Sequence, residues 1–489
     1  MNKFLSDYLP PALVRDLRRS WRTRGYIVML VLALLASVWL QYSATKAETA
    51  TGAAGWSMLL LTLGCVMIWG VVPNRAGAAV SADAKVKGTN FMMLTPLSSR
   101  NIVWATWFSA TCQVLLLAAF GALLMCWRHA TEPLEPLANP LMDAVGRGGV
   151  LNPLALSTSL THEQEWIIYG IVVGLGVLLC AAFMFLAQLS RFFRLVASAV
   201  VVMALLASVW ESFVTTAWLT EENYSPVADF LAGFTGASLG VRVVDAVLVL
   251  VLLLELARRS YAAPAENCSR VVRLLTLVVL ASVPVVYYLL PGEAKLMESQ
   301  MDFCLVFGMV AALSDALLPT YSLVAHDKRA WPVVPAYLQT PGVGQAALFL
   351  VLFMVAYSAM MVWQGQIADG DDVMNEGPLP GVIEGAKVLY VLLLGLFLTD
   401  VLCSRTNVNR PIVYVVLLMV MSFIVTTVTV FMPWDTPAYV YAVLPFVSDR
   451  CLSADSITGL DETLQICCAA ITGGMVLLLL VLLMLRGRR

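Results

Sequence analysis

The chain has 489 residues, of which 60% are hydrophobic and only 13% are charged, against roughly a quarter charged in an ordinary soluble domain. This hydropathy excludes a row of soluble domains, and the formal net charge of −2 excludes a strongly basic nucleic-acid-binding protein. The ten cysteines lie almost all within or beside apolar stretches, which excludes a disulfide framework.

Apolar blocks of about 20 residues, each long enough to cross a bilayer core of about 30 Å, follow one another along the chain. Because backbone polar groups cannot be hydrated in lipid, each block is predicted to be a helix. The twelve predicted spans cover residues 26–44, 55–74, 101–127, 166–189, 195–218, 237–257, 271–290, 303–324, 343–363, 382–402, 411–433 and 464–485. The sequence therefore predicts an all-α polytopic membrane protein with twelve transmembrane helices.

The distribution of Lys and Arg predicts the orientation of these spans. If both termini are cytoplasmic, 23 of the 30 basic residues fall in inner segments and seven fall in outer segments or at outer helix ends. Inner segments of membrane proteins carry such an excess of positive charge. An even number of spans agrees with termini on one side, so we expect both termini to be cytoplasmic.

The order of short and long loops repeats in the two halves of the chain. The best local match pairs Met93-Leu94-Thr95-Pro96 with Leu338-Gln339-Thr340-Pro341, and the two threonines are separated by half the chain length. Six spans is an even number, so the halves are predicted to be parallel repeats. The predicted domains are an interfacial helix at 1–25, a first six-helix half at 26–257, a cytoplasmic linker at 258–270, a second six-helix half at 271–485 and a cytoplasmic tail at 486–489.

The segment before the first span has the pattern of an amphipathic helix. Leu13, Leu17 and Trp21 fall on one face of such a helix, and Arg18 and Arg19 fall on the other. A helix of this kind is expected to lie in the inner headgroup layer of the membrane. A simple positively charged anchor is an equally good interpretation.

The segment between the second and third spans, residues 74–103, is too long for a simple turn. Its middle is compatible with a helix, which Pro96 would end, and Ser98 or Ser99 can cap the helix that follows. We therefore expect a short amphipathic helix that lies against the inner membrane face and ends before the third span.

This segment resembles the ABC type-2 permeases, which are membrane subunits of ABC exporters with six spans per half. In that family a charged segment after the second span leads through an apolar turn to Thr-Pro-Leu-Ser, followed by Ile-Val where the third span begins. The residues that match are Lys85, Lys87, Gly88, Thr89, Leu94, Thr95, Pro96, Leu97, Ser98, Ile102 and Val103. Ala84 and Val86 stand where the family has carboxylates, with Asp83 nearby.

The resemblance implies that the segment docks on a separate cytoplasmic ABC ATPase subunit, in the cytoplasmic (inner) membrane of a prokaryote. ATP and Mg would then be bound by that partner, and further permease or periplasmic subunits could join the complex. The ATPase-coupling residues implied in the first half are Asp83, Lys85, Lys87, Thr95, Pro96, Leu97 and Ser98. Those implied in the second half are Asp327, Lys328, Arg329, Thr340 and Pro341.

The chain carries no sequence pattern for catalysis or for binding a cofactor of its own. None of its seven lysines follows a glycine, so the Gly-Lys pair of a Walker A motif is missing and the chain is not expected to be an enzyme. The three histidines, His129, His162 and His326, lie far apart, and neither HExxH nor a cysteine–histidine zinc spacing occurs. We expect no metal site and no bound cofactor.

A few charges fall within the predicted spans, where they are costly in lipid. Glu211 lies in the outer third of the fifth span, and Arg242 and Asp245 are i,i+3 neighbours in the outer half of the sixth, so the last two can pair. These three residues form either a polar cluster at the outer mouth of a pathway or a structural ion pair near the headgroups, and we favour the second. Asp315 and Asp400 lie near the inner ends of their spans and are expected to face water.

Three classes of function are compatible with a polytopic membrane protein. The first is the permease of an ABC exporter, in which ATPase closure pulls on the interfacial helix and the Thr-Pro segment and switches a cavity from inward to outward access. The alternative is an ion-coupled secondary transporter with twelve spans in two parallel halves. A membrane enzyme acting on lipids is the third, and we find no polar catalytic set for it. Nothing in the sequence selects a substrate.

Overall fold

The structure is a computed structural model of the whole chain. It describes residues 11–22, 24–46, 60, 63–85, 99–131, 162–189, 196, 199, 236–259, 261, 268–290, 294–317, 342–368, 379–404, 410–431 and 462–486. All regular structure in these ranges is helical. The chain divides into two compact units, Met1–Tyr261 (unit 1) and Ala262–Arg489 (unit 2).

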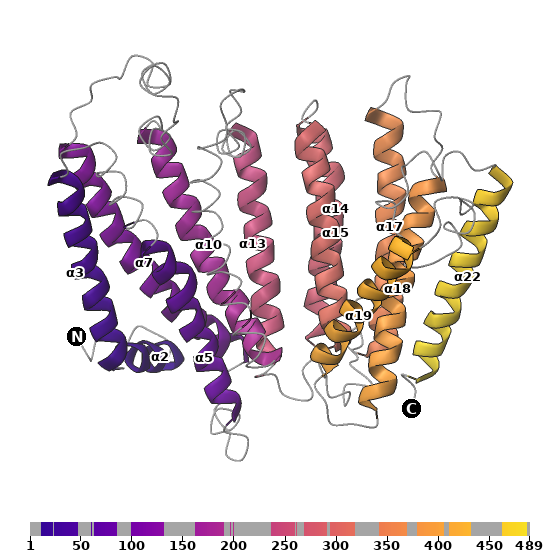
Figure 1. Cartoon of the computed structure of the whole chain (residues 1–489), viewed down its shortest axis with the longest axis horizontal. Coiled ribbons are helices and arrows are strands. Elements are labelled where there is room, and N and C mark those ends of the chain that lie inside the picture. The colour runs from indigo at the N-terminus through magenta and orange to yellow at the C-terminus, as the bar shows by residue number, and fades with distance from the viewer. Residues whose placement is uncertain are drawn as a thin grey trace. The chain divides into compact units, whose positions relative to one another are not determined.

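Unit 1 is a bundle of long helices with one short helix at its end. Its helices are α2 (Pro11–Arg22), α3 (Arg24–Lys46), the π-helix η1 (Val66–Val71), α5 (Val72–Lys85), α7 (Ser99–Thr131), α10 (His162–Leu189) and α13 (Gly236–Arg258). The short helix α2 lies across the end of α3, as Figure 1 shows, and packs on α7. The closest packing in the unit is between α5 and α10.

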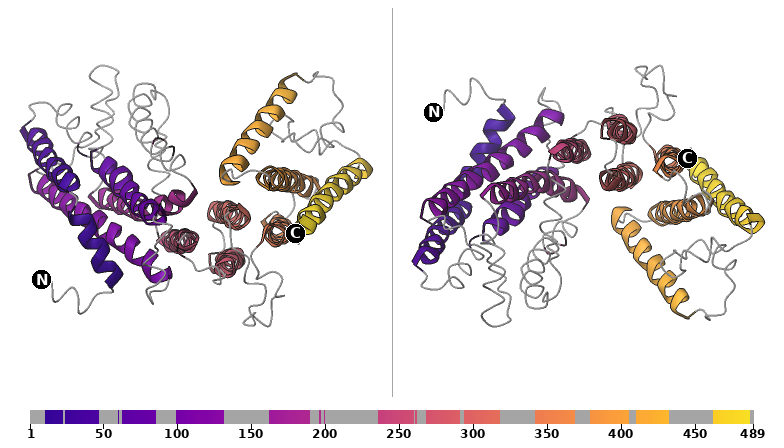
Figure 2. Two further views of the ribbon diagram at one scale, coloured as in Figure 1. Left: turned by 90° about the horizontal axis from the view of Figure 1, so that it is seen from below. Right: turned by 90° about the horizontal axis from the view of Figure 1, so that it is seen from above.

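Unit 2 is also built from long helices. They are α14 (Ser269–Leu289), α15 (Ala294–Leu317), α17 (Val343–Ala368), α18 (Leu379–Cys403), α19 (Arg410–Phe431) and α22 (Glu462–Arg486). The helix α15 packs on both α14 and α17, and α18 packs on both α19 and α22. Seen along the bundle in Figure 2, α14, α15 and α17 are nearly end-on, whereas α19 and α22 are inclined to them.

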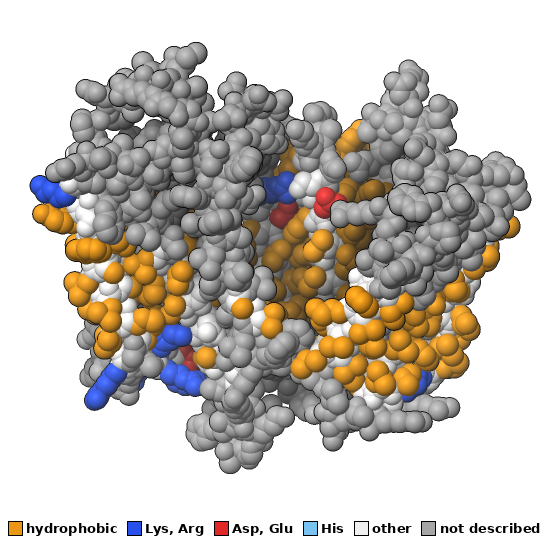
Figure 3. Space-filling view, in the orientation of Figure 1, with side chains coloured by type: hydrophobic (Ala, Val, Ile, Leu, Met, Phe, Trp, Pro, Cys, Tyr) orange, Lys and Arg blue, Asp and Glu red, His pale blue; other side chains and the backbone are white. Residues whose placement is uncertain are grey.

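Nine helices in the described part of the chain are long and apolar enough to cross a membrane. Large hydrophobic side chains such as Leu123, 67% exposed, and Leu477, 60% exposed, lie on their outward surfaces. Figure 3 shows that the described side chains midway along the helices are mainly hydrophobic, with Lys and Arg towards the helix ends. Apolar surface of this extent is typical of helices that face lipid. The chain is therefore a multi-pass membrane protein.

Three of the twelve predicted spans are not among these nine. The sixth predicted span corresponds to α13, which carries four charged residues, and the eleventh corresponds to α19, whose described apolar part is Arg410–Ile424. The fifth, residues 195–218, lies outside the described residues except for positions 196 and 199. The structure thus supports a polytopic helical protein, and the full count of twelve stays a prediction.

The second span differs from its prediction. A single helical stretch runs from residue 63 through η1 to Lys85, so the span continues beyond its predicted end at residue 74. The rest of the segment before α7, residues 86–98, lies outside the described residues, and a short helix on the membrane face stays a prediction there. Ala76 and Val80 of α5 are buried in the core of unit 1 beside Cys180 and Met184 of α10. The predicted end was wrong because small residues let α5 approach α10 closely, a kind of burial that mean hydropathy does not register.

Glycines in α10 differ in what surrounds them. The sequence predicts close packing at Gly170, Gly174 and Gly176, and the structure supports this for one of the three. A Cβ added at Gly176 would collide with the Ile68 side chain of η1 and would lie 3.3 Å from the Ile68 carbonyl oxygen. At Gly170 and Gly174 no heavy atom lies within 4 Å of an added Cβ.

Substitution of Gly176 by Leu is expected to destabilise unit 1 by about 1–3 kcal/mol, because overpacking forces α10 and η1 apart. Thermal unfolding of the purified chain in detergent measures the effect. The matched control is Gly174→Leu on the exposed face of the same helix, which is expected to change stability by less than about 0.5 kcal/mol. Equal effects of the two substitutions would contradict close packing at Gly176.

Candidate functional site

The amphipathic helix predicted before the first span is present as α2, and its apolar face contacts α7. Leu13 is buried against Ala105 of α7, and Leu17 packs on the same pair. Arg18 and Arg19 are exposed, as predicted for the polar face. Trp21 lies within α2, but its side chain is outside the described part of the structure.

A buried carboxylate adds a polar contact between α2 and α7. Asp16 is 7% exposed and accepts a hydrogen bond of 2.6 Å from Oγ1 of Thr106, which is also buried. Its other oxygen pairs with Arg15 at 2.7 Å. The sequence reasoning missed Asp16, although its position three residues after Leu13 places it on the apolar face and signals a specific partner.

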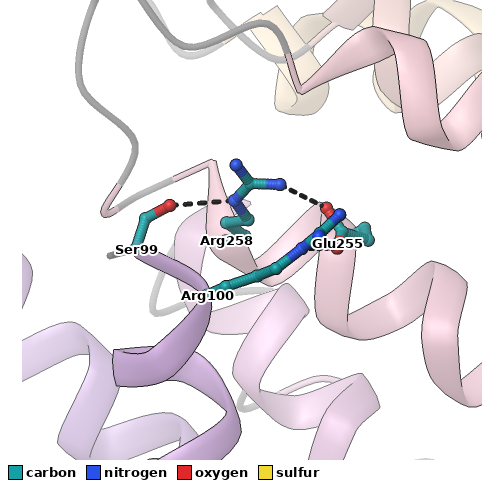
Figure 4. A network of polar contacts seen from close by, with 4 residues as sticks. All are labelled: Ser99, Arg100, Glu255 and Arg258. Carbon is teal, nitrogen blue, oxygen red and sulfur yellow. Dashed lines mark hydrogen bonds and ion pairs between the residues drawn. The ribbon is translucent and has the colours of Figure 1, made fainter. Parts of the chain in front are cut away.

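The beginning of α7 is joined to the end of α13 by a network of charged groups (Figure 4). Nε of Arg100 donates to Oε1 of Glu255 at 2.7 Å, and Nη1 of Arg258 donates to Oε2 of the same carboxylate at 2.8 Å. Nε of Arg258 also donates to Oγ of Ser99 at 2.8 Å. Glu255 is 5% exposed and Arg258 is 8% exposed, so each needs its partner to offset the loss of hydration.

The first two turns of α7 therefore contact both α2 and the end of α13. We call this set of contacts the α7 junction. Its members are Asp16, Ser99, Arg100, Thr106, Glu255 and Arg258. Ser99 and Arg100 of α7 contact Arg258 and Glu255 at the end of α13. The hydroxyl of Thr106 donates to Asp16 of α2, so the three helices are fixed to one another at this end of the unit.

The predicted ATPase-coupling residues lie next to the α7 junction in the sequence, and most of them lie outside the described residues. Asp83 and Lys85 fall in the last turn of α5, but their side chains are not described. The coupling residues outside the described ranges are Lys87, Thr95, Pro96, Leu97, Ser98, Asp327, Lys328, Arg329, Thr340 and Pro341. Their coupling role stays a prediction, and α7 begins directly after Ser98.

The predicted cluster of outer charges is described only in part. Asp245 is buried and Arg242 is half-buried, both near the beginning of α13, whereas Glu211 lies outside the described residues. Whether these three residues meet stays a prediction.

Asp315 does not face water, contrary to the prediction. It is 2% exposed and accepts hydrogen bonds from Nε of Arg273 at 2.9 Å and from the hydroxyl of Ser269. The prediction was wrong because the first turn of α14 lies beside α15 and supplies both partners. Asp400 is partly exposed and pairs with Arg486 at 3.0 Å and with Arg410 at 3.6 Å.

Among the residues that the structure describes, no group of three or more His, Cys, Asp and Glu side chains is arranged to hold a metal ion. Comparison of the chain with known protein families, with curated proteins and with solved structures gives no match. The features of the chain that point to a function are therefore the sequence motif before α7 and the geometry of the α7 junction.

Proposed function

We propose that the chain is the membrane-spanning permease subunit of an ATP-driven ABC exporter. It couples closure of a separate cytoplasmic ATPase to alternating access for the exported substrate. In this proposal twelve spans form two parallel six-helix repeats, both termini are cytoplasmic, and ATP and Mg bind to the partner.

Corresponding helix pairs in the two units support the repeat. In both units the proposed third span packs on the proposed second, fourth and sixth spans. In unit 1 these contacts join α7 to α5, α10 and α13. In unit 2 they join α17 to α15, α18 and α22. The fourth also packs on the sixth in both, α10 on α13 and α18 on α22. In unit 2 the beginning of α17 approaches the end of α22 so closely that a Cβ added at Gly344 would lie 3.0 Å from Cα of Met484. This is the counterpart of the contact between Ser99 and Arg258.

The observation that carries the proposal is the α7 junction. The Thr95–Ser98 segment, which resembles the coupling segment of ABC type-2 permeases, leads directly into Ser99 and Arg100. A displacement of this segment would move the beginning of α7. The Arg100–Glu255 ion pair and the Ser99–Arg258 hydrogen bond would move α13 with it, and the Asp16–Thr106 hydrogen bond would move α2. Glu255 and Arg258 are buried, so breaking their contacts with α7 costs free energy, and this cost allows the contacts to transmit the displacement.

Ion-coupled secondary transport has less support. It requires a carboxylate within a span that exchanges a proton or sodium ion during transport. The sequence offers Asp315 for that role, but Asp315 is already held by Arg273 and Ser269. A carboxylate paired with a guanidinium is poorly suited to bind and release a coupling cation.

The test is replacement of residues 86–98 by a Gly-Ser linker of equal length, which leaves Ser99 and Arg100 in place. The tagged wild-type chain, purified from its native membranes, is expected to bring down an ATPase with vanadate-sensitive ATP hydrolysis, and the linker variant is expected to lose it. The matched control replaces residues 135–147, on the predicted outer side, with the same linker and is expected to retain the ATPase. An ATPase that stays bound to the 86–98 variant, or that is absent from the wild type, would overturn the proposal.

A further inference from the structure

A cavity of about 340 Å³, with several polar side chains in a largely apolar wall, lies between α2, α5 and α7 of unit 1. Guanidinium groups from two different helices line it, Arg19 from α2 and Arg75 from α5. Thr106, Ser109 and Gln113 of α7 supply hydroxyl and amide groups to its wall. We refer to it as the α2–α5–α7 cavity. The cavity shares only Asp16 and Thr106 with the α7 junction. The junction therefore does not explain why the other polar residues surround this cavity.

The charges around this cavity favour an anion. Asp16 also lines the cavity, but its carboxylate is paired with Arg15 and accepts the Thr106 hydrogen bond. The guanidinium of Arg75 is positioned by Tyr26 of α3, whose ring centroid lies 3.7 Å from its central carbon. Stacking of this kind engages the face of the guanidinium, whereas planar or tetrahedral anions are bound by N–H groups in its plane. Two guanidiniums in one partly buried cavity are the arrangement that recognises phosphate.

A buried amide in the cavity wall requires a hydrogen-bond donor from the ligand. Gln113 is only 4% exposed. Its Nε2 donates to the carbonyl oxygen of Ser109 at 3.3 Å, and its Oε1 has no hydrogen-bond partner among the residues that the structure describes. A buried acceptor without a partner costs free energy that a hydroxyl from a ligand would recover. The ligand is therefore expected to carry a hydroxyl group as well as a negative charge.

We propose that the α2–α5–α7 cavity binds a phosphate ester that carries a free hydroxyl, with the phosphate on Arg19 and Arg75 and the hydroxyl on Oε1 of Gln113. This chemistry belongs both to the headgroup of an inner-leaflet glycerophospholipid such as phosphatidylglycerol and to a soluble glycerol phosphate. The cavity lies at the predicted cytoplasmic end of the spans, where basic pockets between helices hold anionic headgroups. Figure 3 shows Lys and Arg side chains gathered at this end of unit 1, below the hydrophobic surface.

Lipid retention by the full-length chain tests the lipid source. Native mass spectrometry of the protein in neutral detergent, with equal amounts of phosphatidylglycerol and phosphatidylcholine, is expected to show preferential retention of phosphatidylglycerol. Arg19→Gln is expected to weaken that retention about tenfold, the effect of losing one charge-assisted hydrogen bond. The matched control is Arg18→Gln, the exposed neighbour on the same helix, which does not line the cavity. Equal losses in the two variants would mean non-specific surface attraction and would overturn the proposal.

A second measurement separates the two sources and tests the hydroxyl contact. A rise in the thermal unfolding midpoint with glycerol 3-phosphate in solution would identify a soluble ester, whereas a rise with phosphatidylglycerol alone would identify the headgroup. No effect of either ligand would overturn the proposal. Gln113→Leu is expected to abolish the preference for phosphatidylglycerol over phosphatidic acid, and a preference that persists in this variant would exclude the contact with Gln113.

Discussion

Substitution of Arg273 by Met is expected to lower the stability of unit 2 by about 3–5 kcal/mol, because it leaves the buried carboxylate of Asp315 without its counter-charge. Arg273 is itself 4% exposed, and its guanidinium also lies 5.6 Å from the ring centroid of Phe349. The loss therefore combines an unpaired charge with a missing contact in the core. Unfolding of the purified chain in detergent, followed by tryptophan fluorescence, measures the effect.

Two further variants show whether the buried charge is the cause. The double variant Arg273→Met with Asp315→Leu removes both charges and is expected to recover most of the lost stability, because a buried ion pair can be replaced by apolar groups at little cost. Arg410→Met removes one partner of the more exposed Asp400 and is expected to cost about 1 kcal/mol or less. If Arg273→Met is no more harmful than Arg410→Met, the Arg273–Asp315 pair does not stabilise the unit as we infer.

Substitution of Glu255 by Gln is the second change with a large expected effect. It removes the carboxylate that pairs with the buried Arg258, at a cost of about 3–5 kcal/mol, and it removes the Arg100–Glu255 ion pair between α7 and α13. We expect a lower unfolding midpoint together with loss of coupled ATP hydrolysis in the complex with the ATPase. Binding of the ATPase itself should persist in protein that remains folded, because residues 86–98 are unchanged.

Arg100→Met separates the role in coupling from the role in stability. The Arg100 side chain is 49% exposed, so the loss of its pair with Glu255 is expected to cost about 1 kcal/mol or less. ATP hydrolysis should nevertheless fall in the complex, because α7 loses its ion pair with α13 and keeps only the hydrogen bond between Arg258 and Ser99. Unchanged hydrolysis in both Arg100→Met and folded Glu255→Gln would exclude the α7 junction as the coupling element.

The hydropathy pattern located the helices well but could not locate their contacts. The third predicted span, residues 101–127, corresponds to α7 at Ser99–Thr131, and the amphipathic pattern around Leu13 and Leu17 corresponds to α2. Arg100 and Glu255, however, are 155 positions apart, and their pairing depends on which helices become neighbours. Burial of Asp315 depends in the same way on α14, so its charge alone suggested exposure to water.

The end of the second span was predicted wrongly for a related reason. Arg75 and Asp83 lower its mean hydropathy, so the sequence suggested that the span ends near residue 74. In the structure α5 is buried through small side chains that fit against α10. The cavity lined by Arg19 and Arg75 was beyond prediction too, since its walls come from three helices whose arrangement no sequence pattern specifies.

The number of residues in the π-helical turn at Val66–Val71 determines which way the side chains of α5 point. The amide of Val72 bonds to the carbonyl of Met67, five positions earlier, so this turn contains one residue more than an α-helical turn. One residue corresponds to a rotation of about 100° around the helix axis. In a relative lacking one residue here, the part of the helix before the turn would stay in place. The Arg75 side chain, which follows the turn, would be rotated away from the α2–α5–α7 cavity. Single-residue insertions and deletions in this turn are thus a route by which evolution could change ligand recognition without rebuilding the bundle.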